Sequence, residues 1–253
     1  MRYARELEVA REAVDLAGRL TLEHFRTGVD VDWKADRSPV TVADRDAEEL
    51  LRKKLGEAFP NDGLLGEEFG KHAGSSGRRW ILDPIDGTQS FIRGVPLYGV
   101  LVGLEEEGRC VLGVAGFPAL GQTFWATRGQ GAYRNGTRIA ASKAVDLADA
   151  TLLSTDVTPE PFGDKYPGFE RLLRSVGRQR GWGDCYGYVL VAMGVAEIMV
   201  DPLLNPWDIA ALVPIVEEAG GAFFTWEGEP TIYGGSGIAT TAALRDRVLA
   251  LVR

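Results

Sequence analysis

The stretch Trp80–Phe91 constrains the chain most. It reads Trp-Ile-Leu-Asp-Pro-Ile-Asp-Gly-Thr-Gln-Ser-Phe. The apolar run Trp80–Leu82 predicts a short strand, and Gly87 and Thr88 predict a tight loop that opens a helix. The acids Asp83 and Asp86 lie between them. Two carboxylates at this spacing can converge on one hard cation, and the free N–H groups of a starting helix can hold an anion. The stretch therefore predicts a metal ion and a phosphate group side by side.

Composition removes several classes of protein. The 253 residues allow one large domain or two small ones, with 45% hydrophobic and 25% charged residues, which is typical of a globular protein. A net charge of -8 argues against non-specific binding of nucleic acid. The cysteines Cys110 and Cys185 have neither metal-ligand nor disulfide-framework spacing, which favours two reduced thiols in a cytosolic protein. The N-terminus lacks an apolar signal region, and no run approaches the ~18 apolar residues that a transmembrane helix needs.

Histidine is scarce. His24 falls in the first predicted helix and His72 in a loop rich in glycine and serine, and neither is near a Ser or Cys nucleophile motif. A triad hydrolase and an imidazole-based zinc site are therefore disfavoured. Any catalysis in this chain must depend on carboxylates.

The first half combines helices with an antiparallel meander. Apolar spacing predicts a helix over 3–27 that stops at Gly28, and a capping box at Thr41 predicts a second helix to about Ala58. Alternation of apolar and polar residues predicts an edge strand at 29–34. A turn is predicted at 36–39 and a short strand at 64–66. Residues 70–77 are predicted to form a polar loop, which we expect to be mobile. From Tyr98 to Ile139 the chain reads as successive strands, with Asn135-Gly136 as a hairpin turn.

The second half alternates strands and helices. Strands are predicted at 152–154, 196–201, 222–225 and 238–240, and helices at 169–176, 186–193, 206–219 and 243–252. This alternation indicates a mostly parallel or mixed sheet covered by helices, so the fold class is α/β, with α+β character in the first half.

Acidic residues recur where predicted strands end or helices begin: Asp44, Glu67, Glu68, Asp83, Asp86 and Asp208. Each acid taken singly is explained by the dipole of a helix first turn. Asp83 is harder to explain, because an acid that ends a buried strand must find a cation or hydrogen-bond donors. Its partner could be one of the nearby arginines, Arg78, Arg79 or Arg93. A hard divalent ion, Mg²⁺ above all, is the better account.

The motif Asp83-Pro-Ile-Asp-Gly-Thr88 closely resembles that of the inositol monophosphatase superfamily. Gly66-Glu67-Glu68 lies upstream of it, and Trp207-Asp208 and Pro214–Gly221 follow in the family's order. The resemblance implies alternating α-β-α-β-α layers in a single domain over residues 1–253. We expect subdomains at about 1–145, with helices and an antiparallel sheet, and at about 146–253, with an α/β arrangement. It also implies Mg²⁺-dependent hydrolysis of a phosphomonoester.

Roles follow from the resemblance position by position. Glu67, Asp83 and the Ile85 carbonyl would hold one Mg²⁺, and Asp83 would bridge to a second that Asp86 and Asp208 complete, with two or three ions in all. Gly87 and Thr88 would offer backbone N–H groups to the phosphate. The catalytic set would be Asp44, Glu67 and Thr88, with Asp44 and Thr88 orienting the attacking water. Lys34 corresponds to a family lysine near the site.

Two runs bear on the substrate. Thr88-Gln-Ser-Phe91 and Gly183-Asp-Cys-Tyr186 resemble the histidinol-phosphate phosphatase branch more than the inositol enzymes. Asp184 would suit the ammonium and imidazole of histidinol phosphate, although it could equally be a helix N-cap. Asp201 falls where relatives place a substrate-facing acid. The expected substrate contacts are Asp86, Gly87, Thr88, Asp184, Asp201 and Asp208. Gln89 and Asn205 depart from that branch, where lysine is usual.

Three functions are compatible with the sequence. The first is a Mg²⁺-dependent histidinol-phosphate phosphatase, the second an inositol monophosphatase or broader sugar-phosphate phosphatase, and the third a regulatory binding protein without catalysis. Intact metal-ligand motifs disfavour the third. We expect a cytoplasmic homodimer whose partner is a small phosphate ester, without membrane or direct nucleic-acid contact.

Overall fold

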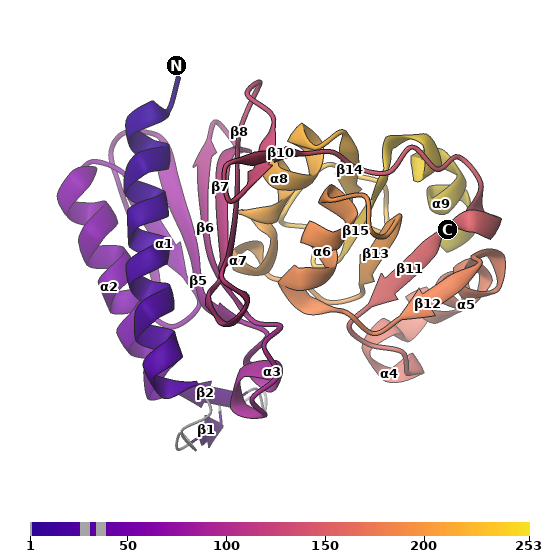
Figure 1. Cartoon of the computed structure of the whole chain (residues 1–253), viewed down its shortest axis with the longest axis horizontal. Coiled ribbons are helices and arrows are strands. Elements are labelled where there is room, and N and C mark those ends of the chain that lie inside the picture. Colours follow the sequence, from indigo (N-terminus) through magenta and orange to yellow (C-terminus); the bar gives the residue numbers. More distant parts are fainter. Residues whose placement is uncertain (1, 26–30, 34–38) are drawn as a thin grey trace.

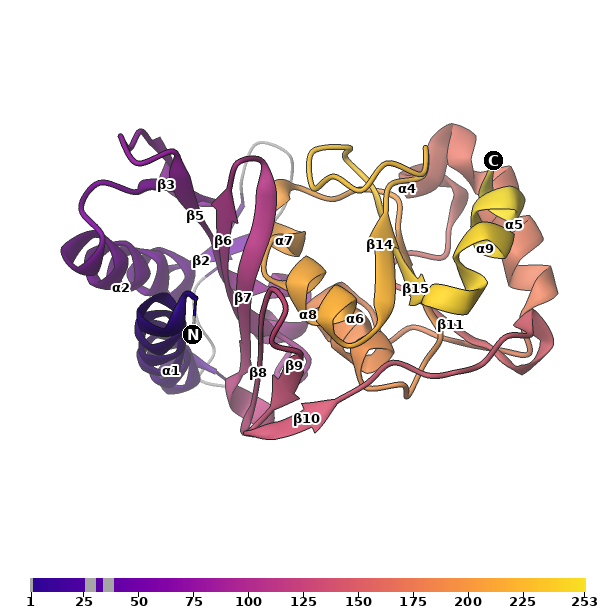
Figure 2. The same cartoon turned by 90° about the horizontal axis from the view of Figure 1, so that it is seen from above.

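The computed structural model describes residues 2–25, 31–33 and 39–253. Five layers follow one another across the molecule in Figure 1: a helix pair, an eight-stranded sheet, a central helix layer, a five-stranded sheet and an outer helix layer. The α-β-α-β-α order expected from the sequence is therefore confirmed. Figure 2 shows the chain leaving the first sheet after β10 and crossing to the second half.

The outer helix pair consists of α1 (Ala4–His24) and α2 (Val42–Ala58). Both were predicted, and the capping box at Thr41 is present. A two-stranded ribbon, β1 (Val31–Trp33) with β2 (Pro39–Thr41), joins them. Pro39 thus belongs to a strand rather than to the predicted turn. The predicted stop at Gly28, the rest of that turn and Lys34 lie outside the described residues.

The first sheet is antiparallel except where β3 runs parallel to β5, and it confirms the predicted meander. Its spatial order is β10-β9-β8-β7-β6-β5-β3-β4. The predicted loop at 70–77 is partly wrong, because Gly70–His72 pairs with β3 as an edge strand. An exposed strand of three residues leaves too little alternation to detect. The bounds are β3 Gly63–Gly66, β4 Gly70–His72, β5 Arg78–Asp86, β6 Gly99–Glu106, β7 Arg109–Phe117, β8 Gln122–Thr127, β9 Ala132–Arg134 and β10 Thr137–Ile139.

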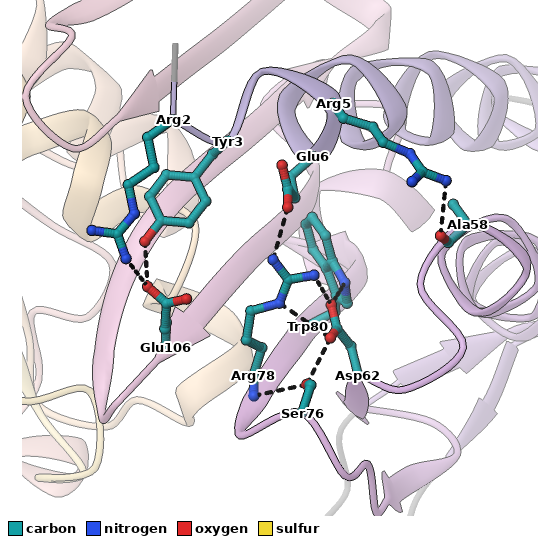
Figure 3. A network of polar contacts seen from close by, with 10 residues as sticks. All are labelled: Arg2, Tyr3, Arg5, Glu6, Ala58, Asp62, Ser76, Arg78, Trp80 and Glu106. Atoms are coloured by element: carbon teal, nitrogen blue, oxygen red, sulfur yellow. Dashed lines mark hydrogen bonds and ion pairs between the residues drawn. The ribbon is translucent and has the colours of Figure 1, made fainter.

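Hydrogen bonds and ion pairs hold the N-terminal segment on this sheet, as Figure 3 shows. Arg78 at the start of β5 donates to Glu6 at 2.7 Å and to Asp62 at 2.8 Å. The Trp80 indole N–H donates to the same Asp62 carboxylate at 3.1 Å. Strand β5 is therefore held in place at its first residues, which steadies the end that carries Asp83.

The central helix layer contains α6 (Asp184–Ala192), α7 (Pro206–Ile209) and α8 (Leu212–Glu218). The prediction of a single helix over 206–219 is wrong, because the helix is interrupted between α7 and α8. Pro214 has no N–H for the Ala210 carbonyl and its ring crowds that carbonyl, which explains the break. The junction lies so close to the sheet that a Cβ on Gly113 would stand 1.8 Å from the Ala211 carbonyl oxygen.

The second sheet is mixed, as predicted, in the order β12-β11-β13-β15-β14. Strand β11 runs parallel to β12 and β13, and the β13–β15 and β14–β15 pairs are antiparallel. Helices α4, α5 and α9 cover its outer face (Figure 1). Strand β12 and helix α4, both very short, escaped prediction. The bounds are β11 Thr151–Ser154, α4 Pro159–Phe162, α5 Tyr166–Ser175, β12 Arg178–Arg180, β13 Ile198–Asp201, β14 Gly221–Phe224, β15 Gly237–Thr241 and α9 Arg245–Val252.

The division into subdomains at about residue 145 stays a prediction. The two sheets fall on either side of that boundary, yet α8 packs between them against β7 and β14. In the described part of the chain, no helix combines the length and apolar content needed to cross a membrane.

Candidate active site

A cavity of about 220 Å³ lies where β5 ends and helix α3 (Thr88–Ile92) begins. Both halves of the chain contribute to its walls: the turn after β3, the end of β5, and the first residues of α3, α6 and α7. Most of these side chains are acids. The lining residues are Glu67, Asp83, Ile85, Asp86, Gly87, Thr88, Gln89, Asp184 and Asp208.

A bulge at the end of β5 brings Asp83 and Asp86 to the cavity wall. The pairing of β5 with β6 shifts register between these two residues, and Pro84 between them has no N–H to offer the ladder. The Ile85 N–H donates to Asp83 Oδ1 at 3.0 Å. The predicted tight loop is therefore a bulged continuation of the strand as far as Asp86.

Gly87 makes the turn from this strand into α3. Its φ of 82° lies in the left-handed region that favours glycine, and Thr88 begins the helix as predicted. The Thr88 hydroxyl donates to the Ile85 carbonyl oxygen at 3.0 Å. A carbonyl oxygen has two lone pairs, so Ile85 retains the capacity to bind a cation.

Glu67 reaches the cavity from the turn after β3, and the buried Glu48 of α2 shapes that turn. Glu48 accepts hydrogen bonds from the backbone N–H groups of Glu68 at 2.7 Å and Phe69 at 3.2 Å. Arg52 donates to Glu48 at 2.6 Å. Glu48 was not among the residues predicted for the site. The signal was present, because Glu48 lies between the apolar Ala47 and Leu51 on the buried face of α2, four residues before an arginine.

Asp44 stands behind the cavity rather than in its wall. It is buried in the first turn of α2, where the Thr41 N–H and hydroxyl donate to Asp44 Oδ2 at 2.7 and 2.6 Å. Burial raises its pKa to about 6, the Thr41 hydrogen bonds oppose this, and Glu68 and Glu67 add to it. Asp44 therefore acts as a helix cap and also lies within the electrostatic field of Glu67.

Asp208 and Asp184 approach from the second half of the chain. Asp208 lies in the first turn of α7, as predicted, and accepts the Asn205 N–H at 2.7 Å. Asp184 is the first residue of α6, with Gly183 rather than Asp184 as the N-cap. Its φ of 49° is unusual for a residue with a side chain, and its N–H donates to Thr155 Oγ1 at 2.8 Å.

Asp201 lies in an adjoining cavity of about 90 Å³ instead of the main one. It ends β13, is buried, and accepts the Tyr188 hydroxyl at 3.0 Å. The smaller cavity shares Asp86, Asp184 and Asp208 with the main one. The sequence analysis did not single out its other lining residues, which are Thr155, Asp156, Tyr188, Leu203 and Leu204.

The acids of the cavity raise one another's pKa. Burial is the main cause for Asp83 and Asp86, and the neighbouring carboxylates Glu67 and Asp184, respectively, add the next contribution, so both pKa values lie well above 3.8. Burial likewise raises the pKa of Asp208 to about 7. Charge concentrated in a buried site without compensation is a common property of functional sites.

The nearby arginines do not supply that compensation. Arg78 pairs with Glu6 and Asp62, Arg79 pairs with Glu105, and Arg93 hydrogen-bonds Gln89. The salt-bridge alternative for Asp83 is therefore wrong. Neither histidine lines the cavity, and both cysteines are free.

The donor set suits a hard cation. Five carboxylates line the cavity, and four of them, from Glu67, Asp83, Asp86 and Asp208, together with the Ile85 carbonyl, form a set of oxygen ligands that suits Mg²⁺ or Ca²⁺. Over the described ranges, no three His, Cys, Asp or Glu side chains are yet gathered closely enough to hold an ion. A cation held by several of these groups at once would have to draw them closer together.

Fold and cavity together define a layered α/β protein with a carboxylate site beside a helix start. The family model of the inositol monophosphatase family matches residues 3–253, so the chain belongs to that family. The predicted recognition is therefore confirmed.

Three of the curated relatives carry the name histidinol-phosphatase. The protein of Chlorobaculum parvum is 47% identical, with 97% of this chain and 96% of the relative covered, and that of Mycobacterium tuberculosis is 40% identical, with 96% of each covered. The solved inositol monophosphatase of Zymomonas mobilis is 34% identical, covers 100% of this chain and 99% of its own, and superposes with a TM-score of 0.89. These names confirm the predicted class of enzyme, a phosphoric monoester hydrolase.

Proposed function

We propose that this chain hydrolyses histidinol phosphate to histidinol and phosphate with Mg²⁺ as cofactor. The observation that carries the proposal is the cavity at the start of α3, where the carboxylates of Glu67, Asp83, Asp86 and Asp208 converge beside the Ile85 carbonyl. Glu67, Asp83, Asp86, Asp208 and the Ile85 carbonyl are the ligands that we assign to two or three ions. When bound there, Mg²⁺ lowers the pKa of a coordinated water and neutralises charge on the leaving oxygen.

The chain's own groups have positioning roles in this proposal. Gly87 and Thr88 present the first N–H groups of α3, which have no partner within the helix, to the phosphate oxygens. Asp44 and Thr88 orient the attacking water, with Glu67 beside them. Phosphoryl transfer depends mainly on position and charge, so the site needs no protein nucleophile.

The acids of the second half favour a cationic substrate. Asp184 lies against Gly87 and lines both cavities, and Asp201 and Asp208 adjoin it. Histidinol phosphate carries an ammonium and an imidazole, and both gain from neighbouring carboxylates. Inositol phosphate offers only hydroxyl groups. The histidinol-phosphatase relatives agree with this choice, whereas the Zymomonas mobilis structure keeps inositol 1-phosphate as the alternative.

A panel assay tests the proposal. Phosphate release is measured with Mg²⁺ on histidinol phosphate, inositol 1-phosphate and fructose 1,6-bisphosphate. We expect kcat/KM to be highest for histidinol phosphate. A preference of tenfold or more for inositol phosphate would overturn the substrate, and no release from any ester would overturn the activity and favour a regulatory binding protein.

We also propose a cytoplasmic homodimer that does not bind nucleic acid directly. The net charge of -8 supports the last part, because phosphate backbones need a basic face. Light scattering after size exclusion tests the assembly, and a mass near 27.4 kDa would show a monomer instead.

A further inference from the structure

A second cavity, of about 310 Å³, lies at the far end of β5 from the carboxylates. In the register of the sheet, Arg78, the first residue of β5, lies opposite Glu106, and Glu106 lies opposite Arg109 across the next hairpin. Asp83 lies five residues further along β5, about 17 Å at ~3.4 Å per residue. The two cavities share no lining residue. The second is lined by Gly108, Arg109, Cys110, Arg128, Val213, Glu217, Phe223, Pro230, Thr231 and Ile232.

Two arginines stand together at this cavity. The Arg128 N–H donates to the Val111 carbonyl at 2.9 Å, so Arg128 lies level with Val111, two residues along β7 from Arg109. Arg109 is the first residue of β7 and Arg128 lies in the turn directly after β8 (Gln122–Thr127), so both arginines stand at the same end of this strand pair and line the same cavity. Within residues 2–25, 31–33 and 39–253, neither guanidinium makes an ion pair or a hydrogen bond.

Several acids lie near this pair of arginines. Glu106 is held by Arg2 at 2.6 Å and by the Tyr3 hydroxyl, as Figure 3 shows. Glu217 lines the same cavity, where burial raises its pKa and the charges of Arg128 and Arg109 lower it. The charged side chains that line this cavity are two guanidinium groups and one carboxylate. The same two arginines also line a neighbouring cavity with Glu106 and Glu107, in a chain whose overall charge is -8.

Part of the remaining wall is apolar. Val213 of α8, Phe223 of β14 and Ile232 are buried side chains that reach this cavity. The Cys110 thiol beside them stays neutral, because burial raises its pKa. An apolar wall with a few convergent polar groups is typical of small-molecule sites, whose volumes begin at ~300 Å³.

We propose that this second cavity is a binding site for a small organic monocarboxylate with an apolar body. Arg109 and Arg128 bind the carboxylate, since a guanidinium matches the two oxygens of a carboxylate through paired N–H donors. The apolar body packs on Val213, Phe223 and Ile232. The alternative is a pair of arginines that only water solvates, and such a pair gives no preference for an anion that carries an apolar group.

The experiment measures binding to metal-free protein, so it does not depend on phosphatase activity. Saturation-transfer NMR is recorded with 3-phenylpropionate and hexanoate as probes and with their neutral amides as matched controls. We expect both carboxylates to bind at least tenfold more tightly than their amides.

Substitution locates the binding. The double variant Arg109→Gln and Arg128→Gln should weaken carboxylate binding at least tenfold and leave the amides unchanged. Both residues are exposed, so the circular dichroism of the variant should match that of the unchanged protein. Arg174→Gln, an exposed arginine on α5, is the control and should bind the probes normally. No binding of either carboxylate, or equal binding by the double variant, would overturn the proposal.

Discussion

Gly87 and Asp184 meet across the active-site cavity although they come from opposite halves of the chain. A Cβ built on Gly87 would lie 3.2 Å from Asp184 Oδ2 and 3.1 Å from the Leu97 carbonyl oxygen. The turn that we assign to the phosphate and the acid that we assign to the substrate therefore fit together only because residue 87 has no side chain.

Gly87→Ala should damage activity more than stability. The left-handed φ of 82° costs an L-residue about 1–2 kcal/mol, and the new methyl group would push Asp184 and the α3 start apart. We expect kcat/KM to fall about tenfold, since these contacts require a shift of only a few tenths of an ångström and rates fall steeply when reacting groups are misplaced. Gly77→Ala is the control: its φ is 79°, nothing lies within 4 Å of the added carbon, and it is remote from the cavity. Comparable loss of activity in the two variants would refute this account of Gly87.

Asp86→Asn should abolish turnover and leave the fold intact. The amide removes a charge that we assign to metal binding, while its oxygen can still accept the Cys185 N–H. Thermal unfolding with and without Mg²⁺ gives a second measurement, because an ion that binds only the folded state raises Tm. We expect a Mg²⁺-dependent Tm increase in the unchanged protein and little in the variant. Substantial phosphate release by Asp86→Asn would contradict the two-metal assignment.

The metal-free protein should lose stability as the pH rises. Asp208 has a pKa of about 7 in the folded chain against an ordinary value of 3.8, so the folded state binds more protons between these limits. Stability then falls with rising pH, by at most about 4 kcal/mol from this group, and the loss is complete above about pH 7. Urea unfolding at pH 5 and pH 8 measures the difference, and Asp208→Asn should reduce it. A metal-free protein that is more stable at pH 8 than at pH 5 would contradict the predicted direction of this pH dependence.

The acidic residues of the site could be predicted from the sequence, but the residues and contacts that hold them in position could not. The spacing of Asp83, Asp86 and Thr88 is local, so the motif predicted the strand end and helix start that the structure contains. The hydrogen bond from the Glu68 N–H to Glu48, and the meeting of Gly87 with Asp184, depend on how distant elements pack, and neither leaves a periodic pattern. The break between α7 and α8 was visible as Pro214, but a continuous apolar run outweighed it. Short edge elements such as β4 and β12 are set by tertiary pairing.

Asp184→Asn should change substrate preference rather than abolish chemistry. Burial raises the pKa of Asp184 to about 6, and Asp156 adds to it. A bound cationic substrate would favour the charged form. We expect kcat/KM for histidinol phosphate to fall at least tenfold and that for inositol 1-phosphate to change less than threefold. Asp164→Asn, on the exposed segment before α5, is the control. An equal loss for both esters would show that Asp184 supports the site generally.

Glu48→Gln should weaken metal binding without contacting the metal. Glu48 accepts the N–H groups of Glu68 and Phe69, and a Cβ on Gly66 would lie 2.1 Å from its Oε1, so its carboxylate fixes the turn that carries Glu67. Glutamine keeps only one acceptor oxygen and loses the ion pair with Arg52. Groups that orient metal ligands typically contribute 10–100-fold in metal affinity.

The Mg²⁺ concentration for half-maximal activity should therefore rise about tenfold in Glu48→Gln, while kcat at saturating Mg²⁺ stays within a few fold. A higher Mg²⁺ requirement with nearly unchanged kcat at saturation distinguishes a positioning role from a general loss of structure. A general loss of structure would lower kcat at every Mg²⁺ concentration. Glu49→Gln provides the matched control, because Glu49 is the next residue of α2 but faces solvent. If the Mg²⁺ dependence of Glu48→Gln matched that of Glu49→Gln, the turn would hold Glu67 in place without the Glu48 carboxylate.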